Sequence, residues 1–102
     1  KELIKPGGEN VYPAEVESVI MEIDGVTGVC VFGVSDTQWG EAIKAVVETA
    51  ASLTAEQVID HVGNRIARFK RPRHVAFTEQ LPTTDDGLVD RDAVKTNWSE
   101  AG

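Results

Sequence analysis

The sequence predicts an α+β domain with a small sheet of about three strands and about three helices packed on it. Two observations lead to this fold class. Two segments have apolar residues at helical spacing, and three shorter apolar segments have the composition of strands. At 102 residues the chain is long enough for one small domain and too short for two.

The helices are predicted at 13–23, 55–67 and 90–98. Pro13 suits a first helical turn, and the apolar residues that follow it recur at helical spacing: Val16, Val19, Ile20 and Ile23. Asp24-Gly25 is typical of a helix end. Thr54 and Gln57 have the spacing of a capping box, and Asp90 is the expected cap of the last helix.

The strands are predicted at 27–34, 41–49 and 74–80. The run TGVCVFGV is apolar almost throughout, which indicates a strand covered on both faces. The run EAIKAVVET follows after a short loop, so we expect the two strands to form one unit. Pro72 separates the third strand, HVAFTEQ, from the preceding helix, and PTTDDG is turn chemistry.

Composition narrows the classes of function. The net charge of −7 argues against general nucleic-acid binding, and no apolar stretch is long enough for a membrane span. Cys30 is the single cysteine and is expected to be a small buried hydrophobe. The absence of an internal disulfide pair and of a signal-peptide pattern favours a cytoplasmic location. Because the chain begins at Lys1 in what reads as the middle of an element, we interpret it as a fragment.

Three features are candidates for a site. Gly7-Gly8 allow positive φ and close ligand approach, although a tight turn before a helix is the simpler explanation. The run RIARFKRPR (65–73) holds five of the ten Lys and Arg residues; it is either a phosphate site or a solvated helix end. Within it Arg71 is the most specific phosphate donor, and Phe69 can stack a base. Trp39, in a loop, is a lid on the core or a ligand platform.

No metal site is predicted. His61 and His74 are far apart in the sequence and lack supporting Cys or Asp residues at ligand spacing. Asp85-Asp86 is most simply part of a turn.

Three segments together resemble one family. KELIKPGGENVYPAEVE, VFGVSDTQWGEAIKAVV and RIARFKRPRHVAFTEQLPTTDDG are similar, in order and spacing, to the C-terminal domain of the acyl-CoA synthetases. These are adenylate-forming enzymes, with the aryl- and fatty-acyl-CoA ligases and luciferase. The resemblance implies that residues 1–102 are a mobile lid domain and that an N-terminal domain, absent from this chain, binds ATP, Mg²⁺ and a carboxylic acid. It also implies that the lid rotates after acyl-adenylate formation so that CoA can displace AMP.

The resemblance assigns roles to individual residues. Lys1 falls at the hinge, and Lys5 matches a position that enters the active site in some members. The tunnel for the pantetheine arm of CoA is expected along Gly7, Gly8, Glu9, Asn10 and Trp39. Phe69 and Arg71 match positions that contact the CoA nucleotide in an aryl-CoA ligase.

One position departs from the family pattern. The closing motif P-x-T-x-x-G-K normally supplies a lysine for adenylation, and in PTTDDGLVDR that position is Leu88. Leu88 is therefore an engineered change, a natural change in a ligase that adenylates poorly or uses another cation, or the mark of a relative that binds without catalysis. An adenylation domain that serves a carrier protein is a further alternative, because the pantetheine arm of a carrier would use the same tunnel. Lys95 is too far along the chain to replace the missing lysine.

Overall fold

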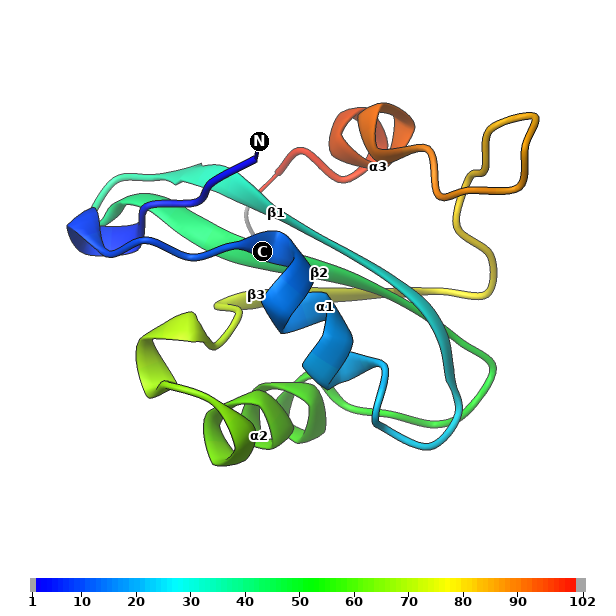
Figure 1. Ribbon diagram of the computed structural model, residues 1–102, viewed down its shortest axis with the longest axis horizontal. Helices are drawn as coiled ribbons and strands as arrows, with labels where there is room; N and C mark the ends of the chain where they lie inside the picture. The colour runs from blue at the N-terminus through cyan, green and yellow to red at the C-terminus, as the bar shows by residue number, and fades with distance from the viewer. Residues whose placement is uncertain (1, 101–102) are drawn as a thin grey trace.

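A computed structural model describes residues 2–100 and contains three α-helices, three strands and two short 3-10 turns in that range (Figure 1). The α+β fold class is confirmed, with a three-stranded sheet and helices packed on it. In chain order the elements are η1 (Pro6–Gly8), α1 (Pro13–Ile20), β1 (Val26–Asp36), β2 (Gly40–Thr49), α2 (Ala55–Arg65), η2 (Arg68–Lys70), β3 (His74–Thr78) and α3 (Arg91–Asn97).

The sheet has the order β1-β2-β3, with β2 in the centre. β1 and β2 form the expected unit, an antiparallel hairpin whose register runs from Val26↔Thr49 to Asp36↔Gly40. β3 lies parallel to β2, from Lys44↔His74 to Glu48↔Thr78, and α2 makes the crossover between them. Both β1 and β3 are therefore edge strands.

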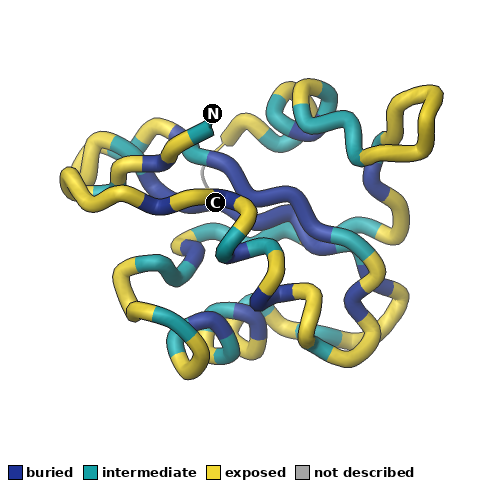
Figure 2. Tube along the Cα trace, in the orientation of Figure 1, coloured by how far each residue is buried: buried dark blue, intermediate teal, exposed yellow. Residues whose placement is uncertain are grey.

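Each face of the sheet carries its own core. One core joins the sheet to α1 and α2 through residues such as Val16, Ile20, Val31, Val58 and Val62. The other core, on the α3 side, includes Cys30, Phe32, Val46, Leu81 and Val94. Figure 2 shows the consequence, with the middle of the sheet buried and most connecting loops exposed. β1 is covered on both faces, as the sequence predicts.

A charged side chain lies within the second core. Lys44, on β2, is 3% exposed, and its ammonium donates a hydrogen bond to the carbonyl of Glu100. A buried ammonium needs such a partner, because its desolvation is otherwise unfavourable. The segment after α3 therefore closes over the sheet at Lys44.

Each helix and strand begins within one residue of its predicted start, and the larger differences are at the ends. α1 begins at Pro13 but ends at Ile20, three residues earlier than expected, because the next residues form turns that lead to Gly25 with φ of 91°. α2 has the full Thr54–Gln57 capping box. The Asp90 carboxylate caps α3 by accepting a hydrogen bond from the Ala93 N–H.

β3 ends at Thr78 rather than at residue 80. The Thr78 hydroxyl donates a hydrogen bond to the carbonyl of Gln80 and accepts one from its N–H, so the chain turns there. In residues 2–100 no helix is long and apolar enough to cross a bilayer.

Candidate functional site

A cavity of about 540 Å³ lies at one end of the molecule, where the β1–β2 turn meets η1 and η2. It brings together five of the candidate residues, Gly7, Glu9, Trp39, Phe69 and Arg71. Pro6, Ile43, Ile59, Arg68, Pro72 and Arg73 complete its lining. Residues more than 60 positions apart in the sequence thus share one pocket, which we call the η1–η2 pocket.

Gly7 makes close contact with Trp39 possible. The Gly7 N–H donates a hydrogen bond to the Trp39 carbonyl at 3.1 Å. A Cβ on Gly7 would lie 3.0 Å from Cε3 of the indole, and the φ of 58° is in the left-handed region that favours glycine. The glycine loop therefore closes on the indole, and the extended segment 9–12 separates it from the start of α1.

Trp39 is held by the turn that carries it. The Asp36 carboxylate accepts hydrogen bonds from the N–H groups of Trp39 and Gln38, both at 2.8 Å, and these bonds lower the pKa of Asp36. The Arg73 guanidinium lies 5.2 Å from the centroid of the indole, within cation–π range. The side chain remains 43% exposed, so Trp39 is a wall of the pocket more than a lid on the core.

η2 presents Arg71 and Phe69 to the same pocket. The Arg71 Nε–H donates to the Arg68 carbonyl at 2.8 Å, which fixes the guanidinium and leaves its terminal nitrogens for another partner. The stem of Arg71 packs over Gly63 of α2, where a Cβ would lie 2.8 Å from Cδ. Phe69 is 45% exposed, and Lys70 lies 5.7 Å from the centroid of its ring.

The charges in the pocket suit an anionic ligand. Arg68, Arg71 and Arg73 line it against one carboxylate, Glu9, although the chain as a whole has a net charge of −7. Ile43, Ile59 and Phe69 supply apolar surface beside the arginines. A thin ligand with phosphate groups at one end matches this combination.

The remaining candidates of the glycine loop do not line the η1–η2 pocket. Gly8, with φ of 87°, and Asn10 are exposed nearby. Lys5 is exposed, and its main-chain N–H donates to the Glu41 carboxylate at 2.8 Å. Lys1, the hinge candidate, lies outside the described residues.

The segment before α3 projects as a loop at the other end of the molecule (Figure 1), and Leu88 belongs to this segment by sequence. The loop is a tight turn in which the Thr84 N–H donates to the Leu88 carbonyl at 2.8 Å and the Gly87 N–H donates to the Thr84 carbonyl at 3.0 Å. Leu88 itself is 65% exposed. A different side chain at this position would therefore face mainly solvent rather than the core.

Two pocket arginines were not selected from the sequence. Arg68 and Arg73 belong to the cationic run RIARFKRPR, but the sequence does not indicate which of its members face a common cavity. Ile43 and Ile59 read as core residues of a strand and a helix. Nothing in the sequence indicates a role for Gly63, because that role is to leave room for the side chain of Arg71.

Neither histidine is part of a metal cluster in residues 2–100, where no group of three or more His, Cys, Asp or Glu side chains comes together. His61 Nε2 lies 3.0 Å from the Glu22 carboxylate. His74 Nε2 is buried without a hydrogen-bond partner within the described structure. Cys30 is buried, and this burial raises the pKa of its thiol to about 11, so it lacks the thiolate character of a nucleophile.

Comparison with known proteins defines the class. Residues 15–88 match the family model of the AMP-binding enzyme C-terminal domain. The match covers more than half of the chain, and the chain therefore belongs to this family.

The relatives are ligases and synthetases. A long-chain-fatty-acid–CoA ligase (FadD13) of Mycobacterium tuberculosis is 40% identical over 97% of this chain. The indoleacetate–CoA ligase of Aromatoleum aromaticum is 42% identical over 93% of it. Among solved structures, a fatty acyl CoA synthetase of Mycobacterium tuberculosis superposes with a TM-score of 0.90 at 38% identity over 96% of this chain. An amide bond synthetase, McbA, of Marinactinospora thermotolerans superposes with a TM-score of 0.91 at 31% identity over 98% of it.

The chain spans about one fifth of the length of these relatives: 20% of the fatty-acid ligase, 19% of the indoleacetate ligase, and 20% and 21% of the two solved chains.

Proposed function

We propose that this chain is the C-terminal lid domain of an ATP-dependent carboxylic acid–CoA ligase. The whole enzyme would form an acyl-adenylate and then an acyl-CoA, with the domain rotating between the two steps. The observation that carries this proposal is the η1–η2 pocket, in which Gly7, Trp39, Phe69 and Arg71 come together. The family match and the CoA-ligase relatives support it.

The pocket has the chemistry that CoA requires. Arg71 would hold phosphate through its free terminal nitrogens, and Phe69 offers an exposed ring for a base. Gly7 and Trp39 would line the path of the pantetheine arm, where a side chain larger than glycine would displace the indole. These groups bind and orient the co-substrate; the lid alone is not expected to be active.

The other substrates belong to the missing N-terminal domain. ATP, Mg²⁺ and the carboxylic acid would bind mainly there, and that domain would be the principal partner of this one. The hinge would lie at Lys1, and Lys5 would approach the active site in the second orientation. The buried single cysteine is consistent with a cytoplasmic enzyme.

Arg71→Ala in the full-length protein tests the CoA assignment. The rate of thioester formation from a supplied acyl-adenylate at subsaturating CoA should fall at least about tenfold, as expected when a charge-assisted contact of about 1.5–3 kcal/mol is lost. Arg65→Ala is the matched control, because Arg65 belongs to the same cationic run but pairs with Glu22 outside the pocket. An unchanged dependence on free CoA would overturn the assignment, and retained activity with a carrier protein alone would favour the carrier-protein alternative.

Leu88 favours a second candidate function, a relative that binds but does not adenylate. Leucine cannot stabilise the negative charge that passes between carboxylate and α-phosphate. Leu88→Lys in the full-length protein should raise pyrophosphate release with a panel of acids by about two orders of magnitude if the chain is a disabled ligase. Because Leu88 is 65% exposed, the substitution should leave stability almost unchanged. No gain would exclude position 88 as the sole limitation.

A further inference from the structure

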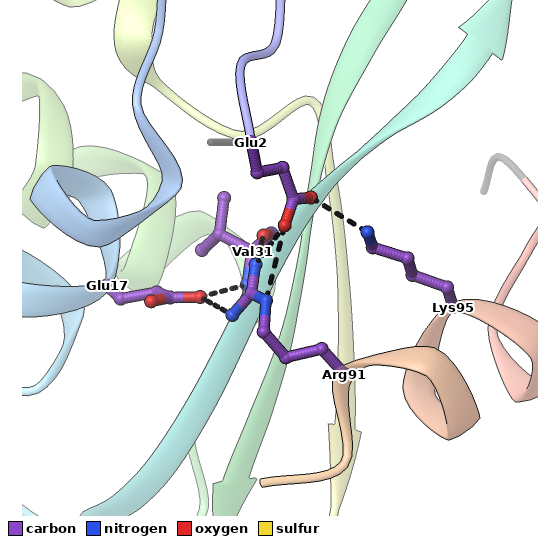
Figure 3. A network of polar contacts seen from close by, with 5 residues as sticks. All are labelled: Glu2, Glu17, Val31, Arg91 and Lys95. Carbon is purple, nitrogen blue, oxygen red and sulfur yellow. Dashed lines mark hydrogen bonds and ion pairs between the residues drawn. The ribbon is translucent and has the colours of Figure 1, made fainter.

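A cluster of charged side chains joins three segments at the outer edge of β1 (Figure 3). The Arg91 guanidinium donates to Glu17 Oε2 at 2.6 Å and to Glu2 Oε1 at 3.0 and 3.2 Å. Lys95 Nζ lies 3.2 Å from the other oxygen of Glu2. The N-terminal segment, α1 and α3 therefore meet through one guanidinium, and we call this group the Arg91 cluster.

The cluster is built into the sheet edge. β1 is an edge strand, and the outward N–H of Val31 donates to Glu17 Oε2 at 2.8 Å, while the Val31 carbonyl accepts from Arg91 Nη2 at 2.7 Å. Two side chains thus take the hydrogen-bonding positions that a further strand would occupy. The Arg91 side chain is 34% exposed, and its two carboxylate partners are 28% and 21% exposed.

Arg91 lies three residues after Leu88, and backbone hydrogen bonds fix the residues between them. Val89 forms a bridge with Thr83, and the Asp90 N–H donates to the Pro82 carbonyl at 2.9 Å. Arg91 is the first residue of α3. The neck of the loop, residues 82–90, is therefore connected to Glu2 through the adjoining Arg91, and Lys95 of α3 adds a second contact to the same carboxylate.

An isolated ion pair on the surface contributes little to stability, because solvent screens it and ordering the two side chains costs entropy. The Arg91 cluster differs because the guanidinium makes four hydrogen bonds from a half-buried position and joins residues that are 89 positions apart in the sequence. The cluster connects the segment that follows the proposed hinge to the loop that bears the proposed adenylation position.

We propose that Arg91 is a positioning residue that fixes the neck of the Leu88 loop to the N-terminal segment at Glu2. The loop then keeps one orientation relative to the point where the chain enters the domain. Its importance for adenylation rests on the proposed function, whereas the coupling between Glu2 and the loop neck does not.

Hydrogen exchange on the full-length protein tests the coupling directly. In Glu2→Gln, which weakens the contacts to Arg91 and Lys95, we expect amides in residues 82–90 to exchange at least about fivefold faster, although the substitution lies at the other end of the sequence. Glu22→Gln is the matched control, because Glu22 accepts two hydrogen bonds from Arg65 but contacts neither the N-terminal segment nor the loop. Unchanged exchange in 82–90 in Glu2→Gln, or an equal rise in the control, would overturn the proposal.

The catalytic consequence is measured separately in the Leu88→Lys background. Arg91→Lys keeps the positive charge but loses the planar guanidinium that donates to several acceptors at once. Pyrophosphate release should therefore fall at least about tenfold, while thioester formation from supplied acyl-adenylate should change less than about threefold. Equal losses in both half-reactions would indicate a merely structural role and would overturn the positioning role. If Leu88→Lys brings no gain in pyrophosphate release, position 88 is not the sole limitation on adenylation, and the exchange measurement still decides whether Arg91 couples the two segments.

Discussion

At the scale of single residues, the shape of the η1–η2 pocket depends on two glycines, which carry no Cβ atom. Gly7 leaves room for the Trp39 indole, and Gly63 leaves room for the stem of Arg71. A Cβ at either position would lie 3.0 Å or less from an atom of a side chain that lines the pocket. Small residues therefore set the shape of the site, while the arginines set its charge.

Gly7→Ala should displace Trp39, and Gly8→Ala should not. Both glycines have positive φ, so each substitution should lower the free energy of unfolding by about 1–2 kcal/mol. Only the Cβ at position 7 meets the indole, because the space at position 8 is open. Trp39 fluorescence in a Trp98→Phe background measures the difference. Identical emission spectra for the two variants would contradict the proposed contact.

At the scale of elements, α1 and α2 are joined at the surface by one carboxylate. Glu22, just after α1, accepts hydrogen bonds from Arg65 at 2.8 and 2.9 Å and lies 3.0 Å from His61, both on α2. Hydrogen bonds from Arg65 and then from His61 lower the pKa of Glu22 from 4.5 to about 2. The two helices that cover one face of the sheet are thus linked in a pH-dependent way.

Acid should weaken the contribution of this link to stability, because the unfolded state binds a proton at Glu22 at a higher pH than the folded state does. Since the pKa of Glu22 is lower in the folded state, its contribution to stability is complete above about pH 4.5 and is lost as the pH falls toward 2. Between about pH 6 and about pH 2.5, the urea midpoint of the wild type should therefore fall further than that of Glu22→Gln. Glu56→Gln, which removes an exposed carboxylate from α2, should retain the full wild-type dependence. Parallel pH profiles for Glu22→Gln and the wild type would refute the link.

At the scale of the whole molecule, two cores share one sheet. Alternate residues of β1 enter opposite cores, with Val31 on the α1–α2 side and Cys30 and Phe32 on the α3 side. Neither core can be lost without removing support from the strands that build the other. We therefore expect the domain to unfold in one cooperative transition.

Ile20→Ala tests this cooperativity. Ile20 is fully buried in the α1–α2 core, and its truncation should cost about 2–5 kcal/mol. Trp98 packs against the opposite core, yet its fluorescence transition in urea, read in a Trp39→Phe background, should shift together with the circular dichroism of the backbone. Ser18→Ala, on the exposed side of α1, should change stability by less than about 0.5 kcal/mol. A Trp98 transition that stays in place would show that the two cores unfold separately.

The elements and the family were predictable from the sequence because their signals are local. The spacing from Val16 to Ile20, the Thr54–Gln57 pair and the apolar run at 27–34 each depend on near neighbours, and all three predictions agree with the structure. The exact end of α1 was wrong by three residues, because turn geometry after Ile20 outweighs the apolar period that continues to Ile23.

The site required the tertiary structure. The sequence selected Gly7, Trp39 and Arg71 one by one, but only the parallel β2–β3 pairing and the crossover through α2 bring η2 beside the β1–β2 turn. The same is true of Arg91, whose partners at positions 2, 17 and 31 meet it only at the edge of β1. Sequence spacing determines which residues share a helix or strand face, whereas contact between distant segments depends on how the sheet orders its strands.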